Sequence, residues 1–127
     1  MKIYGIGTDI VSVERIKKSL KTKNFIHRIF SEQEITKCKK LSSGHNCFAK
    51  RFAAKEAFSK ALGTGISKGI KFNEIFILNE KNGKPFIKLV GNTKKIVEKK
   101  FKKKKSKISL SLSDEKKYAV AFVTISL

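Results

Sequence analysis

The longest helix-forming stretch of this chain covers residues 46–62, NCFAKRFAAKEAFSKAL. Alanine is frequent in it and neither glycine nor proline interrupts it, so the helical propensity of the whole segment is high. Asn46 can cap its start. Gly63-Thr64-Gly65 follows, with a glycine where a left-handed residue commonly ends a helix. We therefore expect one long central helix with the shorter segments of the chain around it.

Several short apolar segments are bounded by turn-forming residues, which is typical of strands. The expected strands cover residues 2–11, 72–78, 86–90, 108–112 and 118–125. Gly5 and Gly7 interrupt the first strand, which indicates a bulge or a close approach of another group to its backbone. Asn82-Gly83 lies between the second and third strands and is a hairpin signal.

Shorter helices are expected between these strands. Ser12 is a plausible N-cap, with Val13, Ile16 and Leu20 following at helical spacing. Ser31 with Glu34 forms a capping-box pattern, and residues 94–101 form another short helix. The order of elements predicts an α+β fold with a largely antiparallel sheet. We see neither a linker nor a repeat, so residues 1–127 are expected to form one domain.

The charge of the chain narrows the range of partners. It has 30 Lys and Arg against 10 Asp and Glu, a net charge of +20, and only three of the basic residues are Arg. Such a surface favours nucleic acid, acidic proteins, phosphorylated small molecules or anionic membranes. Hydrophobic residues make up 40% of the chain, which is enough for a core and excludes disorder as its main state. The lysine tract at residues 99–105 is interpreted as a solvated helix end or as a contact for nucleic acid or an acidic protein.

The two cysteines and the first residues of the chain bear on the cellular compartment of the protein. Cys38 and Cys47 are nine positions apart with no further cysteine, so we expect reduced thiols in a cytoplasmic protein. His27 and His45 show no metal-ligand spacing. Glycine and a carboxylate interrupt the first eleven residues, unlike a signal peptide. No apolar run approaches the roughly 18 residues of a membrane span.

Two carboxylates stand out as candidates for chemistry. Asp9 lies within an apolar strand, where aspartate is disfavoured; it either ends the strand and caps the next helix or has a metal-binding or catalytic role. Glu56 lies on the central helix one turn before Lys60, so a purely structural role for it would be an intrahelical ion pair on a solvated face. The residues alone leave both alternatives open. Gly63-Thr64-Gly65 lacks the spacing of a phosphate-binding loop and is weak evidence by itself.

Several motifs together resemble one family. They are residues 4–11 (YGIGTDIV) with Glu14-Arg15-Ile16, residues 50–66 (KRFAAKEAFSKALGTGI), residues 82–85 (NGKP), residues 111–113 (SLS) and residues 118–121 (YAVA). In this order they resemble the holo-acyl-carrier-protein synthases over essentially the whole chain. The resemblance implies the 4′-phosphopantetheinyl transferase fold and assembly as a homotrimer with active sites at subunit interfaces. It also implies transfer of 4′-phosphopantetheine from coenzyme A to a serine of apo acyl carrier protein, releasing 3′,5′-ADP in support of fatty acid biosynthesis.

The resemblance also implies a set of site residues. Asp9 and Glu56 match the carboxylates that hold Mg²⁺, and we expect Lys55 to be the lysine nearest the reacting centre. The coenzyme A residues would be Arg51, Lys55, Lys60, Gly63, Thr64, Gly65 and Pro85. The residues for the acidic carrier protein would be Arg15, Phe25, Ile26 and Arg28. Asp114 occupies a position where many members of the family have His, so a proton-accepting role there is open.

Two other functions compete with this interpretation. A small basic RNA-binding domain would use the lysine tract for phosphates and exposed Phe for stacking. No aromatic RNA-binding motif is present and Arg is scarce, which speaks against it. An enzyme-like trimer without activity is the second alternative, and the presence of Asp9, Glu56 and Lys55 speaks against that. We expect neither nucleic acid nor a membrane as a partner.

Overall fold

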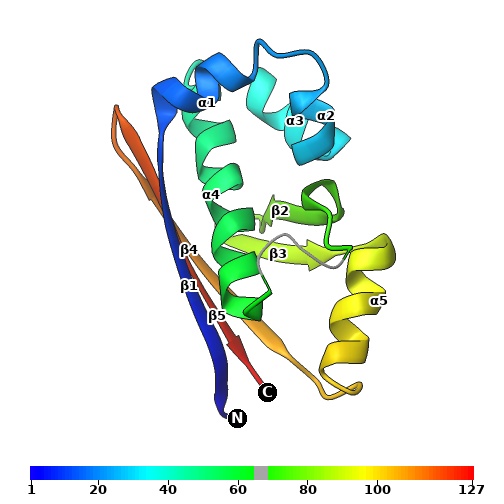
Figure 1. Cartoon of the computed structure of the whole chain (residues 1–127). Helices are drawn as coiled ribbons and strands as arrows, with labels where there is room; N and C mark the ends of the chain where they lie inside the picture. Colours follow the sequence, from blue (N-terminus) through cyan, green and yellow to red (C-terminus); the bar gives the residue numbers. More distant parts are fainter. Residues whose placement is uncertain (65–68) are drawn as a thin grey trace.

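The computed structural model describes residues 1–64 and 69–127 and has an α+β architecture (Figure 1). Its elements in chain order are β1 (Ile3–Ser12), α1 (Val13–Ser19), α2 (Phe25–Ile29), α3 (Glu32–Lys39), α4 (Gly44–Leu62), the 3-10 turn η1 (Phe72–Glu74), β2 (Ile75–Asn79), β3 (Pro85–Leu89), α5 (Gly91–Lys100), β4 (Lys107–Asp114) and β5 (Tyr118–Ser126). The strands form a three-stranded sheet in the order β1-β5-β4 and a separate β2-β3 hairpin, all antiparallel. The predicted α+β class is therefore confirmed.

The long helix α4 lies between the two sheets, as Figure 1 shows. The three-stranded sheet covers one side of it and the β2-β3 hairpin lies on the other side. The short helices α1, α2 and α3 gather near the start of α4, whereas α5 lies beyond the hairpin. The two chain ends lie side by side, and the Lys2 amide donates to the carbonyl of Leu127 over 2.8 Å.

Small residues allow α4 to lie directly against β1. A Cβ atom added to Gly5 would lie 2.0 Å from the carbonyl oxygen of Ala61, and one added to Gly7 would lie 1.9 Å from that of Ala57. Both distances are far below van der Waals contact, so only glycine fits at these two positions. The close approach predicted for this strand is thus confirmed, and its partner is the backbone of α4. The predicted bulge is present as well, as a register shift between Ile3 and Gly5.

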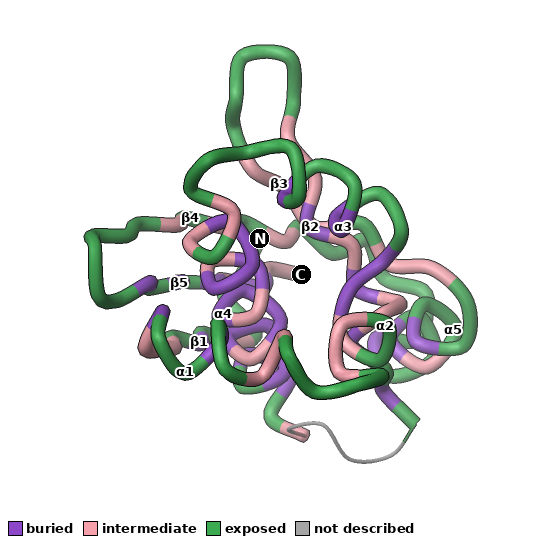
Figure 2. Tube along the Cα trace, turned by 90° about the horizontal axis from the view of Figure 1, so that it is seen from above, coloured by how far each residue is buried: buried purple, intermediate pink, exposed green. Residues whose placement is uncertain are grey.

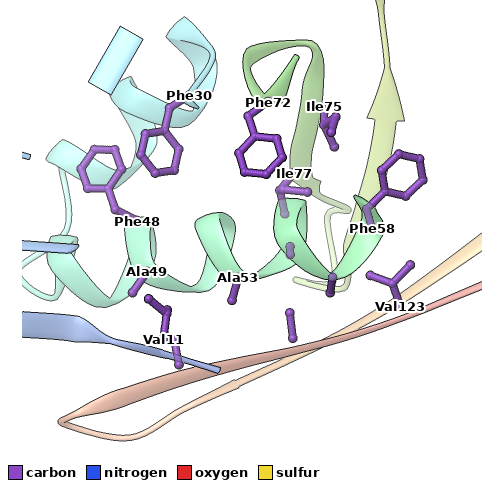
Figure 3. Close-up of a cluster of buried hydrophobic side chains, with 14 of the residues drawn as sticks. Val11, Phe30, Phe48, Ala49, Ala53, Phe58, Phe72, Ile75, Ile77 and Val123 are labelled. Carbon is purple, nitrogen blue, oxygen red and sulfur yellow. The ribbon is translucent and has the colours of Figure 1, made fainter. Parts of the chain in front are cut away.

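Large aromatic residues pack on the other side of α4. Figure 3 shows Phe30, Phe48 and Phe72 on that side, while Ala49 and Ala53 face Val11. The rings of Phe30 and Phe48 meet edge to face with centroids 4.9 Å apart. In Figure 2 much of α4 is drawn as buried. Helix α4 is therefore the centre of the core, with small residues toward one sheet and large ones toward the hairpin.

Most of the predicted helix ends are confirmed. The Ser12 side chain accepts from the Arg15 amide, Ser31 and Glu34 form a complete capping box, and Gly63 has the left-handed conformation with φ 82°. Helix α4 begins at Gly44, two residues before the predicted cap. Asn46 lies inside the helix, and its side chain reaches the end of β4 instead. Residues 72–74, expected at the start of a strand, form the 3-10 turn.

The prediction of two reduced thiols is wrong for this structure. Cys38 and Cys47 form a disulfide, with Cα atoms 5.4 Å apart. Cys38 lies near the end of α3 and Cys47 near the start of α4, and the chain reverses direction between the two helices. This reversal brings together side chains that the nine-residue spacing alone did not indicate. Over the residues that the structure describes, no helix has the length and apolarity to cross a membrane.

Candidate active site

Asp9 lies at the junction between β1 and α4. Alternate residues of a strand share a face, so Asp9 points to the same side as Gly7 and the buried Val11. Its side chain is 16% exposed, and its Oδ1 lies 3.3 Å from the ammonium of Lys60. The same ammonium donates to the Thr8 carbonyl over 3.0 Å. The structure therefore brings together Asp9 and Lys60, two residues of the predicted site.

Glu56 lies one turn before Lys60 on α4 and belongs to the same group. Burial raises the pKa of the Glu56 carboxyl, and the negative charge of Asp9 raises it further. The charges of Lys60 and Arg15 act in the opposite direction. Among the described ion pairs, Lys60 pairs with Asp9 and not with Glu56. The alternative of an intrahelical Glu56–Lys60 ion pair is therefore not the arrangement found. Two carboxylates and one ammonium thus meet at the junction of β1 and α4.

This arrangement fits a hard divalent cation. Mg²⁺ is usually held by one or two carboxylates together with phosphate oxygens and water. Among the described residues, no cluster of three or more His, Cys, Asp and Glu side chains is available as an all-protein metal cage. A cation between Asp9 and Glu56 would remove the repulsion that contributes to the raised pKa of Glu56. These two carboxylates are the candidate metal ligands.

A pocket of about 550 Å³ lies beside Glu56. Four apolar side chains line it, namely Ile29, Phe52, Ile70 and Phe72. Glu56, Arg28 and Asn73 supply polar groups at its walls. The pocket therefore joins one predicted metal ligand to Arg28, a residue predicted to bind the carrier protein.

Arg51 lies on a different side of α4, because five residues separate it from Glu56 and this spacing turns the helix by about 140°. It is 4% exposed and donates to the Asn79 side chain over 2.8 Å and to the Cys47 sulfur over 3.2 Å. Its Nε has no hydrogen-bond partner, and burial lowers the pKa of its guanidinium. Lys37 donates to the same Asn79 oxygen over 2.7 Å. Two cations therefore converge on one neutral amide, an arrangement that favours a nearby anion.

Lys55 lies in the core of the protein, on the side of α4 that faces α3. Its side chain is fully buried, and its ammonium donates to Glu34 and to the backbone carbonyls of Ile29 and Phe72. Burial lowers the pKa of Lys55 to about 8 despite the opposing effect of Glu34. All three protons of the ammonium are used inside the protein. The lysine beside Asp9 is Lys60, and the role of Lys55 at the reacting centre stays a prediction.

The remaining residues predicted to bind coenzyme A lie in two different places. Gly63 ends α4 in an exposed position, with open space where a side chain would be. Thr64 follows it and is half-buried, whereas Gly65 lies outside the described residues. Pro85 begins β3 and is paired in register with Asn79, the residue that Arg51 contacts. Arg51 and Pro85 therefore both lie next to Asn79 of the β2-β3 hairpin. Gly63 lies elsewhere, at the end of α4.

The residues predicted to bind the carrier protein lie on α1 and α2. Arg15 and Arg28 are exposed, and Phe25 and Ile26 are half-buried. The ring of Phe25 stacks on Phe52 with centroids 6.3 Å apart. This surface combines exposed cations with a partly buried apolar centre, and Arg28 also lines the pocket beside Glu56.

Asp114 connects the end of β4 to the start of α4. It accepts a hydrogen bond from Asn46 over 2.9 Å and forms an ion pair with Lys50 over 3.3 Å. Asn46 precedes Glu56 by ten residues, which is about 15 Å along a helix axis. Within one chain, Asp114 therefore acts on the first turns of α4, away from Asp9 and Glu56.

Sequence reasoning missed two residues that organise the site. Glu34 was noted as part of a capping box, and its buried contact with Lys55 was not foreseen. Asn79 was expected only as the residue after a strand. The capping-box pattern was the only sequence signal at Glu34, and it did not indicate burial; for Asn79 the sequence offered no signal.

Comparisons with known proteins agree with these features. Residues 5–123 match the family described as the 4′-phosphopantetheinyl transferase superfamily. The holo-[acyl-carrier-protein] synthase of Pelagibacter ubique is 52% identical over 125 residues, covering 98% of each chain. That of Vibrio campbellii is 46% identical over 125 residues, covering 97% of each.

Solved structures give the same result. The crystal structure of holo-[acyl-carrier-protein] synthase from Neisseria meningitidis has a TM-score of 0.88 and 41% identity, and covers 98% of this chain and 99% of that one. The Helicobacter pylori holo-[acyl-carrier-protein] synthase in complex with coenzyme A has a TM-score of 0.78 and 37% identity, and covers 95% and 99%. The full-length match in sequence and in fold places the chain in the 4′-phosphopantetheinyl transferase superfamily, among the holo-[acyl-carrier-protein] synthases.

Proposed function

We propose that this protein transfers 4′-phosphopantetheine from coenzyme A to a serine of apo acyl carrier protein, with Mg²⁺ as cofactor. The observation that carries the proposal is the meeting of Asp9, Glu56 and Lys60 at the junction of β1 and α4, next to a pocket. The reaction forms a phosphoester bond to the serine oxygen and breaks the pyrophosphate bond. It releases 3′,5′-ADP and a proton.

Such a transfer depends on positioning and on neutralising charge more than on covalent catalysis. Asp9 and Glu56 would hold Mg²⁺, which when bound polarises the pyrophosphate and stabilises the charge that develops on the leaving oxygen. Lys60 is exposed and adjacent to Asp9, so its ammonium can neutralise a phosphate oxygen at the same place. This assigns to Lys60 the part that was expected of Lys55.

Coenzyme A would be bound by groups on both sides of α4. We propose Arg51 for a phosphate group, because it is buried without a carboxylate partner among its described contacts. Pro85 would shape the same part of the site from the hairpin. Gly63, Thr64 and Gly65 would allow the coenzyme to approach the backbone at the end of α4.

The carrier protein would bind along α1 and α2. Arg15 and Arg28 would attract an acidic partner, and Phe25 and Ile26 would supply a small apolar contact. Arg28 also lines the pocket next to Glu56, so a partner bound there would present its serine close to the metal ligands. This geometry supports the assignment of α1 and α2 to the carrier.

We propose a homotrimer with active sites at subunit interfaces. The outer face of β1 and β5 supports this, because Ile6, Ile10 and Phe122 are 60%, 65% and 45% exposed on it. Contiguous exposed apolar side chains of this kind mark interaction surfaces. Phe122→Glu should give a monomer by light scattering with a matching loss of transfer. A cytoplasmic location and a role in fatty acid biosynthesis belong to the same proposal and rest on the resemblance.

The test is a transfer assay with the purified protein. Coenzyme A, Mg²⁺ and apo carrier protein are incubated with it, and the carrier is analysed by mass spectrometry. We expect the mass of one phosphopantetheine to be added, and none after chelation of the metal. An unchanged carrier mass would refute the activity. RNA binding without transfer would support the RNA-binding alternative.

A further inference from the structure

Glu34 is a buried carboxylate with every oxygen in use. It is 1% exposed, although it belongs to the first turn of a surface helix. Its Oε1 accepts from the Ser31 amide over 2.8 Å and from the Lys55 ammonium over 2.7 Å. Its Oε2 accepts from the Ile77 amide over 3.1 Å. One carboxylate therefore links α3, α4 and β2.

Lys55 extends this link to two further segments. Its ammonium donates to the Ile29 carbonyl over 2.7 Å, at the end of α2, and to the Phe72 carbonyl over 2.8 Å, in η1. Neither the Glu34 nor the Lys55 side chain has solvent-exposed surface. The two side chains thus fix the backbone of five separate segments around one buried point, and we call them the Glu34–Lys55 pair.

Stability alone is a weak explanation for such a pair. Removing two charges from water is costly, and replacing a buried ion pair by apolar residues of similar volume is often neutral or stabilising. A pair of this kind can instead select one arrangement of the segments that it joins. Three of the segments joined here, α2, α4 and η1, border the pocket beside Glu56.

The link to the pocket is direct at two residues. The carbonyl groups of Ile29 and Phe72 accept hydrogen bonds from Lys55, and both residues also line the pocket. Lys55 also immediately precedes Glu56 on α4. The Glu34–Lys55 pair therefore sets the distance between two walls of the pocket and the orientation of the helix turn that carries Glu56.

We propose that Glu34 and Lys55 are positioning residues, which hold the end of α2 and the turn η1 in the arrangement that lets Glu56 and Arg28 face the same pocket. This inference rests on the proposed transferase function. Because misplacement of about 1 Å can reduce a rate by roughly 100-fold, breaking the pair should affect turnover more than binding of coenzyme A. Arg51 and Pro85, proposed for the coenzyme, make none of these hydrogen bonds, and the charge of Glu34 acts on Arg51 only at longer range.

The test compares the double variant Glu34→Leu/Lys55→Met with the wild type. Apolar side chains of similar length should keep the protein folded, with a melting temperature near that of the wild type. We expect kcat to fall at least roughly tenfold, with the KM for coenzyme A changed less than about threefold. Methyl NMR of Ile29 and Ile70 should show displaced signals at the pocket, while the Val123 methyls on β5 stay in place.

Two single variants complete the design. Glu34→Gln keeps the shape of the side chain but cannot accept hydrogen bonds from all three donors. Its kcat should therefore fall in the same manner. Glu32→Gln is the matched control, because Glu32 lies on the same helix with its side chain 83% exposed, and it should behave as wild type.

A folded double variant with kcat within about threefold of wild type would show that the pair is only structural, and would overturn the proposal. Failure of both the double variant and Glu34→Gln to fold would overturn it as well, because the pair would then be a requirement of the whole fold. Absence of transfer by the wild type would instead refute the proposed function, so the two failures are distinguishable.

Discussion

Asp9 and Glu56 carry like charges, yet the fold holds them on facing surfaces of β1 and α4. Repulsion of this kind is unfavourable unless a cation is placed between the groups. Lys60 provides part of that charge through its contact with Asp9. A divalent ion would provide the rest, which is why the pair is interpreted as a metal site and not as a surface ion pair.

Replacement of either carboxylate by its amide should remove the proposed metal site while preserving the shape of the side chain. Asp9→Asn or Glu56→Gln should lower turnover by at least roughly 100-fold, as expected when a charge clamp on the transition state is lost. Initial rates at limiting Mg²⁺ measure this, and circular dichroism should show intact folding. Glu14→Gln, on the exposed part of α1, is the control. Near-normal turnover of either site variant would contradict the assignment.

The pKa of Glu56 offers a second measurement, which needs no substrate. In the metal-free protein, burial and the charge of Asp9 both raise it. Asp9→Asn removes the second cause, so the pKa of Glu56 should move down toward its ordinary value. Carboxyl NMR titration measures the change. Asp114→Asn should leave it unaffected, since Asp114 is not among the charges that act on Glu56. An unchanged pKa in Asp9→Asn would mean that the two carboxylates are not coupled.

At the level of elements, the contact of β1 with α4 depends on glycine. Gly7→Ala would place a methyl group against the Ala57 carbonyl, so the helix and strand must separate. Overpacking of this kind costs about 1–3 kcal/mol, and the displacement should also move Glu56 and Lys60 away from Asp9. Urea unfolding and initial rates measure both effects. Thr36→Ala, at an exposed position of α3, is the control, and equal behaviour of the two variants would refute the close-packing account.

The disulfide between α3 and α4 can be tested by counting thiols. In denaturant without reductant, the protein should show no reactive thiol, and it should show two after reduction. A loop of this length closed by a disulfide contributes about 2–3 kcal/mol in the chain-entropy account. Reduction should therefore lower the unfolding midpoint. Two reactive thiols before reduction would restore the expectation that both cysteines are free.

The elements that were predicted correctly are those determined by residues close together in the sequence. The Ser31 capping box, the Gly63 cap and the hairpin at Gly83 each depend on a few consecutive positions. The site required contacts between distant segments. Asp9 and Glu56 were proposed as metal ligands through the resemblance, since the pattern of residues alone left two alternatives open for each. The buried position of Lys55 was not predicted, because helix spacing cannot distinguish a solvated lysine from one that bonds to Glu34 in the core.

At the scale of the whole molecule, the net charge of +20 should accelerate the encounter with an acidic carrier protein. Electrostatic steering raises association rates by roughly 10- to 1,000-fold and weakens as salt screens it. The carrier's association rate, measured by stopped flow, should therefore fall steeply from low to physiological salt. Coenzyme binding should respond less.

Charge reversal locates the effect on the surface. Arg15→Glu or Arg28→Glu should slow carrier association more than Lys103→Glu, which makes the same change in net charge on the turn after α5, at the far end of the molecule from α1 and α2 (Figure 1). A flat salt profile would refute steering. Equal effects of all three reversals would mean that net charge acts without a preferred docking surface.

The two unequal sides of α4 also fix its rotation about its own axis. Alanines meet the glycines of β1 on one side and phenylalanines fill the space on the other (Figure 3), so only one angular setting of the helix satisfies both sheets. Each residue of an α-helix advances by about 100° around the axis. One residue inserted between Ala57 and Lys60 would therefore turn Lys60 away from Asp9 while Glu56 kept its place. The number of residues in this part of the helix is therefore fixed by geometry.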